Sequence, residues 1–347
     1  MSKIIVTGGA GYIGSHVVYD LLCRGYEVIV IDNLSNSSGL NIDNIMRNKY
    51  WGPLLYTYYG DCEEIERFDP RNVDGIIHFA AYKNVGESVK QPLKYYSNNI
   101  NSLLKVLEYV GRYRIPNLIF SSSCTVYGEP DNVPVNEDES IKSSPSPYGQ
   151  SKIICERILE DFYARNEWAN ILSLRYFNPI GGYSDIPIGE NPTGGYESLM
   201  SRLNRWVFGL DDFKIYGDNY ATEDGTAIRD YLDVGDLSRC HVECLQYIMQ
   251  RFGFYNFYNV GTGSGTSVKQ LVDTYLKVNN IENKIITFGP KREGDIDKIF
   301  ADPSKIENDI GFRCERSCHL NHLVGDTKIA FGSPIQFMKT QNDELFF

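Results

Sequence analysis

The chain has 347 residues, which suggests two domains, or one large domain that carries an added lobe. Hydrophobic residues make up 42% of it, a composition typical of a globular protein rather than a disordered one. The formal net charge of −11 argues against nucleic acid and against an anionic membrane as partners. No apolar run is long enough to span a bilayer, and the start has no secretory signal, so we expect a cytoplasmic protein.

The eight cysteines are scattered along the chain and form no pattern typical of a disulfide framework. Cys240 and Cys244 are four residues apart, as are Cys314 and Cys318, and His319 follows the second pair. These residues could belong to a metal site or be ordinary reduced thiols. Neither spacing matches a common zinc pattern, so we expect reduced thiols and no metal.

Short apolar runs recur in the first half of the chain, and most are continuous rather than alternating. Continuous runs are typical of parallel strands that are covered on both faces. Segments with helical spacing lie between them, at 15–25 and 101–113. The alternation predicts an α/β fold with a doubly wound parallel Rossmann sheet. The expected strands lie at 3–8, 27–32, 54–61, 75–81, 117–123 and 171–178.

The composition changes after Asn178. Residues 179–228 are rich in Gly, Pro, Asn and Asp and have few periodic runs, which indicates a smaller α/β lobe with long loops. A later strand at 254–261 leads to a helix, which Ser267 and Gln270 open with the spacing of a capping box. We therefore expect a Rossmann domain over 1–178 and a C-terminal substrate lobe over 179–347. The chain is expected to return to the first domain near 229–260.

A glycine-rich turn, VTGGAGYIGSH, follows the first expected strand and opens the first helix. Small residues let the backbone turn tightly and approach a pyrophosphate, which the free N–H groups of the helix N-terminus then bind. Asp32 ends the next strand, eighteen residues after the last glycine, where a carboxylate accepts hydrogen bonds from ribose hydroxyls. The turn could serve packing alone, but in this context it predicts a dinucleotide site. Its glycines are Gly8, Gly9, Gly11 and Gly14.

Three further residues concern the cofactor. Asn33 stands where a phosphate-binding arginine could be, and Asp32 would repel a 2′-phosphate, so NAD is favoured over NADP. Asp61 ends the third strand and could meet the adenine, or it could be a solvated carboxylate. Lys83 lies in a stretch that ends the fourth strand, at the edge where such sheets bind ligands. It could reach the cofactor or be an ordinary surface lysine.

The stretch PSPYGQSK places Tyr148 four residues before Lys152. Ser146 can cap a helix there and Pro147 suits its first position, so the phenol and the ammonium share one face. A phenol with a pKa of about 10 is a poor base at neutral pH. The nearby ammonium and a cationic nicotinamide both favour the phenolate, and we expect them to lower that pKa. The pair could be a routine helix-surface contact, but serines at 121–123 end the preceding strand and favour alcohol–ketone redox chemistry.

The chain resembles the extended short-chain dehydrogenase/reductase superfamily, and within it the UDP-glucose 4-epimerase family. The matching stretches cover about residues 3–313, and in this order they are highly specific. Sugar-nucleotide dehydratases of the superfamily carry an Asp-Glu pair after the strand-end serine, whereas this chain has Cys124 and Thr125. The matching stretches are VTGGAGYIGSH, IDNLSNS, HFAAYKNVGESV, PLKYYSNN, FSSSCTVYG, SPYGQSK, LRYFNPIG, TEDGTAIRDYLDV, YNVGTG and REGD.

The resemblance implies an epimerase that interconverts UDP-galactose and UDP-glucose by transient oxidation at the sugar C4. In this scheme Tyr148 removes the proton of the 4-hydroxyl while NAD accepts the C4 hydride. Ser123 hydrogen-bonds the same hydroxyl, and Lys152 holds the nicotinamide ribose and tunes Tyr148. The 4-keto sugar then rotates and takes the hydride back on its other face, so NAD ends unchanged and can remain tightly bound.

The resemblance also assigns binding residues. Besides Gly8, Gly11 and Gly14 and the pair Tyr148 and Lys152, the implied cofactor contacts are Tyr12, Ile13, Asp32, Asn33, Asp61, Cys62, Phe79, Ala80, Lys83, Asn98 and Phe177. Besides Ser123, the implied UDP-sugar contacts are Asn178, Ser198, Leu199, Lys214, Ile215, Tyr216, Arg229, Arg292, Asp295 and Ile299. Guanidinium groups suit a diphosphate, which supports the two arginines on chemical grounds, although each alone could be a surface residue.

The sequence departs from the family pattern at three places. Glu197 and Ser198 stand where the family has an asparagine pair, so one phosphate hydrogen bond is weakened or remade by Ser198. Ile299 occupies the family's size-selecting position. A tyrosine at this position narrows the pocket and a small residue admits an N-acetyl group, and isoleucine is intermediate in size. Acceptance of UDP-N-acetylhexosamines is therefore open. The end of the chain, 314–347, lacks the tryptophan-containing closing helix expected of the family.

Two other functions compete with this interpretation. A UDP-uronate 4-epimerase or a 4,6-dehydratase would share the cofactor, but a uronate needs an extra cation near the sugar C6, and none is evident. A non-catalytic NAD-binding module would typically lose the tyrosine or the lysine of the active pair, and this chain keeps both. By analogy with related enzymes we expect a homodimer that pairs through the helices around 95–113 and 148–165. The apolar residues compatible with that interface, or with the core, are Ile153, Ile154, Ile158 and Leu159.

Overall fold

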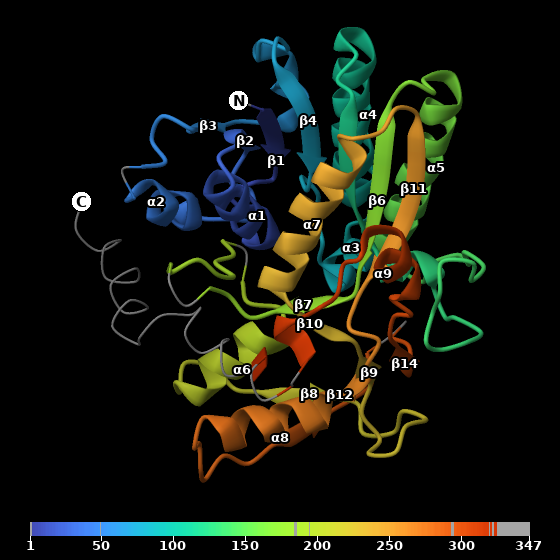
Figure 1. The fold of residues 1–347 in the computed structure, drawn as a ribbon. Coiled ribbons are helices and arrows are strands. Elements are labelled where there is room, and N and C mark those ends of the chain that lie inside the picture. Colours follow the sequence, from blue (N-terminus) through green and yellow to red (C-terminus); the bar gives the residue numbers. More distant parts are fainter. Residues whose placement is uncertain are drawn as a thin grey trace.

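A seven-stranded parallel sheet forms the centre of the computed structural model (Figure 1). The structure describes residues 2–48, 50–183, 186–193, 195–292, 295–318, 320 and 323–324. Every strand pair in this sheet is parallel, which confirms the predicted doubly wound α/β fold. In spatial order the strands are β11 (Phe254–Val260), β6 (Asn170–Tyr176), β5 (Asn117–Ser123), β4 (Val73–His78), β1 (Lys3–Thr7), β2 (Glu27–Asp32) and β3 (Leu55–Tyr59).

Helices cover both faces of the sheet, which explains why its strands are apolar without alternation. Along β1, Ile4 and Val6 belong to the hydrophobic cluster on one face, and Ile5 belongs to the cluster on the other. The first face is covered by α1 (Tyr12–Cys23), α2 (Leu40–Met46) and α7 (Val234–Ile248). The second is covered by α4 (Pro92–Tyr113) and α5 (Pro147–Arg165), which pack side by side, with α3 (Val85–Lys90) against their N-terminal ends.

The strand order indicates which edge of the sheet binds ligands. The order reverses between β1 and β4, and ligands of such folds bind outside the carboxyl ends of the strands at this point. The glycine turn after β1 and the stretch after β4 lie there, and the serines that end β5 are on the neighbouring strand.

Beyond this edge the described polypeptide forms short strands and the helices α6 (Leu199–Val207) and α8 (Val268–Val278) (Figure 1). Their shared core is built from Leu203, Ile215, Tyr231, Leu271 and Tyr275 among others. Ser267 caps the second helix by accepting a hydrogen bond from the Gln270 backbone N–H at 3.0 Å. The strand pairs are β7 (Asn178–Ile180) with β10 (Tyr231–Asp233), β8 (Lys214–Tyr216) with β13 (Thr287–Gly289), and β9 (Ile228–Arg229) between β12 (Thr266–Ser267) and β14 (Lys298–Ile299). Helix α9 (Ser304–Ile310) instead packs against α7 and β11, and its Ile306 belongs to the hydrophobic cluster that contains Ile4 and Val6.

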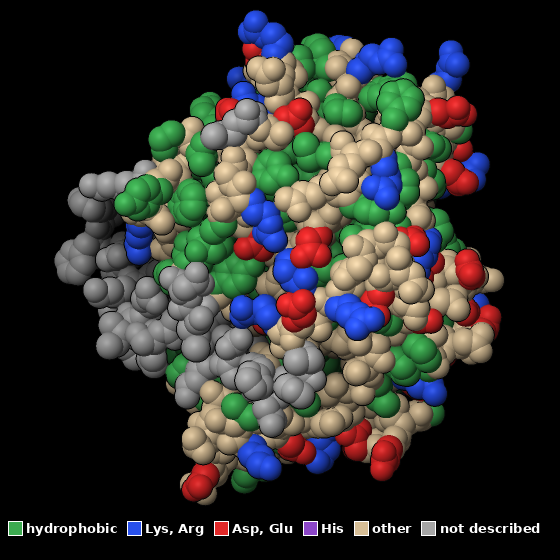
Figure 2. Space-filling model, viewed as in Figure 1, with side chains coloured by type: hydrophobic (Ala, Val, Ile, Leu, Met, Phe, Trp, Pro, Cys, Tyr) green, Lys and Arg blue, Asp and Glu red, His purple; other side chains and the backbone are tan. Residues whose placement is uncertain are grey.

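The described surface and cysteines indicate neither a membrane span nor a disulfide. On the face shown in Figure 2, acidic and basic side chains are interspersed among polar ones. Among the described helices, none is long and apolar enough to cross a membrane. The sulfurs of Cys240 and Cys244 lie 3.9 Å apart inside α7 as free thiols. The sequence departure at the chain end falls largely on 325–347, outside the described residues.

Candidate active site

The turn after β1 is closed so tightly that only glycine fits at two of its positions. Gly8 has φ of +70°, and a Cβ there would lie 2.7 Å from the Ala80 backbone nitrogen. A Cβ on Gly14 would lie 2.3 Å from the Gly8 carbonyl oxygen. Helix α1 begins after Gly11 without a side-chain cap, so its first N–H groups are left for a ligand. This donor set and the close backbone approach fit the pyrophosphate of NAD.

The carboxyl ends of β2 and β3 bring three predicted cofactor residues together. Asp32 accepts hydrogen bonds from the backbone N–H groups of Ala10 and Leu34, both at 2.9 Å. Burial raises its pKa, and these hydrogen bonds oppose that effect. The Asn33 side-chain amide donates to Asp61 at 2.6 Å. Cys62 follows as a buried thiol whose pKa burial raises to about 12.

The stretch after β4 lines the same edge. Phe79 packs against the ring of His241 with their centroids 4.9 Å apart, and Ala80 closes the glycine turn. Lys83 forms an ion pair with Glu190 at 3.1 Å, and its ammonium lies 5.8 Å from the ring centroid of Tyr12. No local pattern in the sequence points to Glu190, which lies 107 residues from Lys83 along the chain.

The remaining cofactor candidates lie on neighbouring elements. The Tyr12 hydroxyl donates to the Gly181 carbonyl at 2.8 Å, and Ile13 packs on the hydrophobic cluster of its face. On α4, the Asn98 amide donates to Asn99 at 3.1 Å. Phe177 is buried between β6 and β7. Tyr12 is thus tied to the segment after β7, which joins the two parts of the structure.

The predicted catalytic pair occupies the first two turns of α5. Ser146 caps this helix by accepting from the Gly149 N–H at 3.2 Å, and Pro147 is its first residue, as predicted. Ser123, at the end of β5, accepts from the Thr125 hydroxyl at 3.0 Å, and its side chain lowers the pKa of the Tyr148 phenol. The structure therefore brings together the serine and the tyrosine that the sequence pairs.

The pKa of Tyr148 corrects one expectation. Burial raises it to about 12, and the hydrogen bond with Ser123 acts in the opposite direction. We expected the ammonium of Lys152 to help lower this pKa. That ammonium instead donates to the Ser121 carbonyl at 2.6 Å and lies 6.0 Å from the Tyr148 ring centroid. Desolvation of the phenol therefore outweighs the lysine.

Lys152 itself is buried in an apolar setting. Its side chain lies over Phe120, with the nitrogen 4.7 Å from the ring centroid. Burial lowers its pKa to about 8, while Cys155 and Glu156 oppose the shift. A lysine in this state titrates close to physiological pH, which is typical of functional lysines.

A buried ionic network supports the end of β5, and the sequence analysis missed it. Arg175 on β6 binds Glu156 on α5 through two hydrogen bonds of 3.0 and 2.7 Å. The Ser122 hydroxyl donates to the same carboxylate at 2.5 Å, and Arg175 donates to the Tyr127 hydroxyl at 2.9 Å. An arginine inside an otherwise apolar strand was the available signal, because a buried charge needs a partner.

Two predicted UDP-binding groups, Arg229 and Asp295, form an ion pair in the second part of the structure. Arg229 also donates to the Ile296 carbonyl at 2.8 Å, and the Tyr220 hydroxyl donates to Asp295 at 2.9 Å. The Arg292 guanidinium carbon lies 4.6 Å from the ring centroid of Tyr216. Of the predicted cations, Arg229 is therefore held by a carboxylate and Arg292 by an aromatic ring.

Strand β8 presents its residues alternately to two sides. Lys214 is exposed and Tyr216 half-buried, whereas Ile215 is buried in the core of this part of the structure. The Ile215 side chain is thus a packing residue, and only its backbone is left to meet a ligand. Ile299 is also buried and lies in register with Arg229 across the β9–β14 pair.

The three remaining UDP-sugar candidates lie at element ends. The Asn178 backbone N–H donates to the Asp230 carbonyl at 2.9 Å at the start of β7. Ser198 caps α6 by accepting from the Ser201 N–H at 3.2 Å, and its hydroxyl donates to Glu190. Leu199 is the first residue of that helix. The hydroxyl of Ser198 is therefore already engaged.

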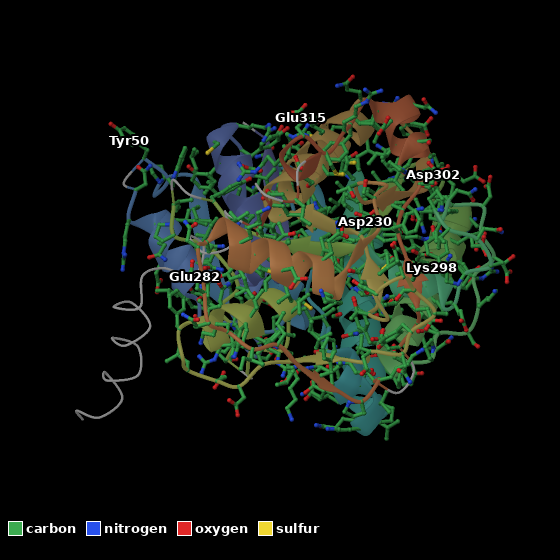
Figure 3. All side chains as sticks on the ribbon, turned by 90° about the horizontal axis from the view of Figure 1, so that it is seen from below. Tyr50, Asp230, Glu282, Lys298, Asp302 and Glu315 are labelled. Atoms are coloured by element: carbon green, nitrogen blue, oxygen red, sulfur yellow. The ribbon has the colours of Figure 1, made fainter. Side chains whose placement is uncertain are left out.

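Asp230 is a further residue that the sequence analysis missed. It lies inside the molecule, whereas Tyr50 lies at the periphery (Figure 3). Its carboxylate accepts from the backbone N–H groups of Thr262 (2.9 Å), Gly263 (3.1 Å) and Ala301 (3.1 Å). One buried carboxylate thus fixes the loop after β11 and the chain after β14, beside Arg229 and Ile299.

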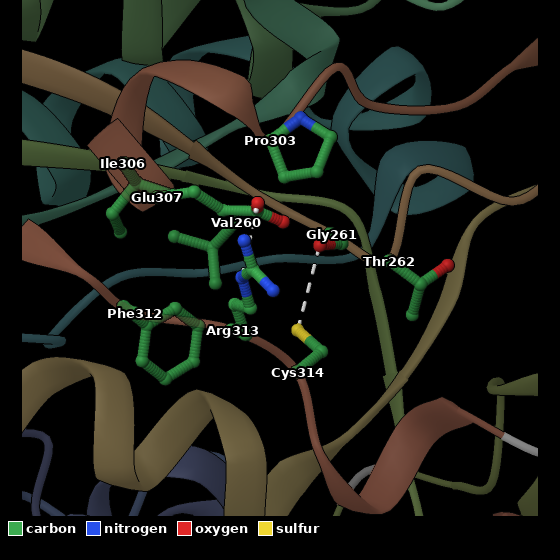
Figure 4. A pocket seen from close by; sticks show the side chains of 9 residues that line it. All are labelled: Val260, Gly261, Thr262, Pro303, Ile306, Glu307, Phe312, Arg313 and Cys314. Carbon is green, nitrogen blue, oxygen red and sulfur yellow. Dashed lines mark hydrogen bonds and ion pairs between the residues drawn. The ribbon is translucent and has the colours of Figure 1, made fainter.

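A pocket lies beside α9, next to the loop that Asp230 holds, because Thr262 lines it (Figure 4). The Cys314 thiol donates to the Gly261 carbonyl at 3.4 Å, and Arg313 pairs with Glu307 at 3.2 Å at its mouth. None of the predicted site residues lines it. The lining residues are Val260, Gly261, Thr262, Pro303, Ile306, Glu307, Phe312, Arg313 and Cys314.

Comparison with known proteins gives consistent results. A family model described as the NAD dependent epimerase/dehydratase family matches residues 4–261. The chain is 41% identical over 330 residues to a UDP-glucose 4-epimerase of Bacillus subtilis, spanning 93% of this chain and 95% of that protein. It is 40% identical over 326 residues to a UDP-glucose 4-epimerase of Caenorhabditis elegans, spanning 90% and 93%.

Solved structures with the same overall fold extend the comparison. The UDP-glucose 4-epimerase of Bifidobacterium longum, in complex with NAD+ and UDP, superposes with a TM-score of 0.89 at 35% identity, covering 99% of this chain and 100% of that one. The UDP-Glc/GlcNAc 4-epimerase of Campylobacter jejuni gives a TM-score of 0.79 at 32% identity, covering 95% and 98%.

Proposed function

Because this chain belongs to the NAD dependent epimerase/dehydratase family, and to the UDP-glucose 4-epimerases within it, we propose that Ser123, Tyr148 and Lys152 carry its catalysis. The enzyme is an NAD-dependent isomerase that interconverts UDP-galactose and UDP-glucose. The observation that carries the assignment of residues is that Ser123, at the end of β5, acts on the Tyr148 phenol, at the start of α5, and lowers its pKa against the effect of burial. Ser123 lies at the carboxyl edge of the sheet, on the strand next to β4.

The cofactor is held by residues of the first three strand ends. The glycine turn and the first N–H groups of α1 suit its pyrophosphate, and Asp32 suits the adenosine ribose. Asn33 and Asp61 lie beside Asp32. NAD, when bound, supplies the positively charged ring that takes the hydride from the sugar C4 and returns it.

The protein moves the proton of the sugar 4-hydroxyl. Tyr148 accepts this proton and later returns it, and Ser123 hydrogen-bonds the same oxygen. With a pKa of about 12 the phenol is protonated at neutral pH until a positive charge comes close. Lys152, oriented by the Ser121 carbonyl at 2.6 Å, is already beside the site, so the further positive charge would have to come from the ring of bound NAD. Because the hydride must return to the other face of C4, the 4-keto sugar must turn in the site, and Tyr148 exchanges the proton with the sugar oxygen in both directions.

The nucleotide is proposed to bind on the second part of the structure. The Arg229–Asp295 pair and Arg292 offer planar donors for the diphosphate, and Tyr216 offers an aromatic ring near the base. A firm hold on UDP leaves the hexose free to turn. Because Ile299 is smaller than a tyrosine, we further propose that UDP-N-acetylhexosamines are accepted as second substrates.

The organisation around the site is also proposed. We assign 1–178 to NAD binding and 179–347 to UDP-sugar binding, with α7 and β11 returning to the first domain. Two copies are proposed to pair through α4 and α5, which lie side by side, in the cytoplasm. On α4, Leu104 keeps 38% of its surface exposed, which suits such an interface. Of the four apolar residues considered for it on α5, Leu159 is fully buried in the core. A monomer in light scattering would refute the dimer.

Product analysis tests the function. The purified protein is incubated separately with UDP-galactose and with UDP-N-acetylgalactosamine, each with and without added NAD, and the nucleotide sugars are separated by chromatography. UDP-glucose should form from UDP-galactose without net formation of NADH. Product from the second substrate would support the proposed role of Ile299. No product from either substrate, with NAD present and the fold intact, would refute the proposal.

A further inference from the structure

Glu190 is a nearly buried carboxylate that connects the cofactor side of the molecule to the UDP side. Its side chain keeps only 11% of its surface exposed. One oxygen pairs with Lys83 at 3.1 Å. The other accepts from the Ser201 hydroxyl at 2.5 Å and from the Ser198 hydroxyl. Three segments of the chain therefore meet at the Glu190 side chain: Lys83 follows β4, Ser198 precedes α6, and Ser201 lies within α6.

The backbone on both sides of Glu190 is fixed to the first domain. Asn41 on α2 donates to the Gly189 carbonyl at 2.8 Å and accepts from the Gly189 N–H at 3.2 Å. The Asn191 side chain donates to the same Asn41 at 2.8 Å. Glu190 is thus held in place independently of Lys83 and of α6. It has the rigidity needed to position both of them.

The charges at this point balance one another. Burial raises the pKa of Glu190, but Lys83 and the two serine hydroxyls outweigh burial, so the net shift is downward. The carboxylate is therefore ionised at neutral pH and can hold the ammonium of Lys83 near the ring of Tyr12. The Ser198 hydroxyl lies within hydrogen-bond distance of both Glu190 and the Ser201 hydroxyl, so it ties the start of α6 to Glu190.

We propose that Glu190 is a positioning residue that sets Lys83 for the cofactor and the N-terminal turn of α6 for the nucleotide sugar. This inference rests on the proposed function, which places Lys83 at the cofactor and the N-terminal turn of α6 at the nucleotide sugar. Glu190 contacts neither ligand in this scheme. It acts through Lys83 in one direction and through the two serines in the other.

The test is a set of variants of the full-length enzyme with two binding readouts. Glu190→Gln should raise both the Kd of NAD and the Kd of UDP about tenfold, because charge-assisted hydrogen bonds to both partners are lost. Lys83→Met should raise the Kd of NAD mainly. Ser201→Ala, which leaves Ser198 in place, should raise the Kd of UDP mainly and by less. Titration calorimetry with NAD and with UDP measures both constants.

Two further results separate positioning from general damage. Saturating substrate should restore the kcat of Glu190→Gln to within about threefold of the native value, so that the loss is confined to KM. The double variant Lys83→Met, Glu190→Gln should bind NAD no more weakly than the poorer single variant, because both remove the same interaction. Asp212→Asn, which changes an exposed carboxylate just beyond α6, is the matched control and should leave both constants unchanged.

The outcomes are distinguishable from failure of the proposed function. If the native protein neither binds UDP nor converts UDP-galactose, the function itself is refuted, and this inference with it. If the native protein does both but Glu190→Gln changes neither Kd or only one, the positioning role alone is refuted. Additive losses in the double variant would also refute it. If Glu190→Gln does not fold, Lys83→Met and Ser201→Ala still test the proposal. If either variant raised the Kd of NAD and the Kd of UDP equally, it would refute the claim that Glu190 acts on NAD through Lys83 and on UDP through the serines.

Discussion

The ammonium of Lys152 donates a hydrogen bond to the carbonyl of Ser121 at 2.6 Å, two residues before Ser123, whose side chain lowers the pKa of the Tyr148 phenol. This contact joins α5 to the end of β5. It sets the distance between the lysine and the phenol, with the nitrogen 6.0 Å from the tyrosine ring centroid. The strand end and the helix therefore form one unit, and the chemistry depends on both.

The pH dependence of activity should reveal Lys152. Its pKa is lowered to about 8 by burial, so the ammonium is present below about pH 8 and is lost above it. We expect kcat/KM to fall as the pH rises through about 8. In Lys152→Arg the guanidinium stays charged, so this fall should disappear even though the overall rate is lower. A native profile that stays flat well above pH 8 would contradict the prediction.

The network under β5 should be costly to break. Glu156→Ala leaves Arg175 buried without its carboxylate, and we expect the free energy of unfolding to fall by about 3–5 kcal/mol. Urea denaturation measures the change. Arg157 is the matched control: it pairs with Glu160 at 2.8 Å on the exposed side of α5, and Arg157→Ala should cost less than about 1 kcal/mol. Equal losses in the two variants would show that burial does not govern this network.

Removal of the Arg229 guanidinium should affect binding more than chemistry. Arg229→Met is expected to raise KM for UDP-galactose about tenfold or more, because a charged donor to the diphosphate is lost. The kcat should change much less, since the residue is proposed to contact the diphosphate and not the sugar C4. Arg313, which pairs with Glu307 at the pocket beside α9, is the control. If Arg313→Met raised KM as much, the effect could not be assigned to the predicted site.

The identity of residue 299 should set substrate choice. The ratio of kcat/KM for UDP-N-acetylgalactosamine to that for UDP-galactose is the measurement, because a loss of stability affects both substrates equally. Ile299→Ala should raise this ratio and Ile299→Tyr should lower it, as the pocket widens and narrows. A ratio that is the same in both variants would exclude Ile299 as the selecting residue.

The sequence predicts the sheet well because its signals are local. Continuous apolar runs mark strands covered on both faces, and Ile4, Ile5 and Val6 do point to both cores. The glycine turn and the cap at Ser146 depend on neighbouring residues alone, so their geometry was predictable. The serine and the tyrosine proposed for catalysis, Ser123 and Tyr148, lie near each other because each stands at a predictable element end.

What the sequence did not reveal depends on contacts between distant segments. Glu190 lies 107 residues from Lys83, and Asp230 lies 71 residues from Ala301, and no local pattern links either pair. The position of Ile215 in the core depends on which face of a three-residue strand is covered. The raised pKa of Tyr148 follows from burial, whose extent a motif does not give.

The measurement that tests the central claim most directly is product formation by Tyr148→Phe beside the native enzyme, with UDP-galactose as substrate. The native enzyme should form UDP-glucose. The variant should fold and still bind NAD, but its kcat should fall by about 10²–10⁴, because the group that moves the proton is removed while the packing of the ring is kept. Near-native turnover by Tyr148→Phe would show that the proton is moved elsewhere.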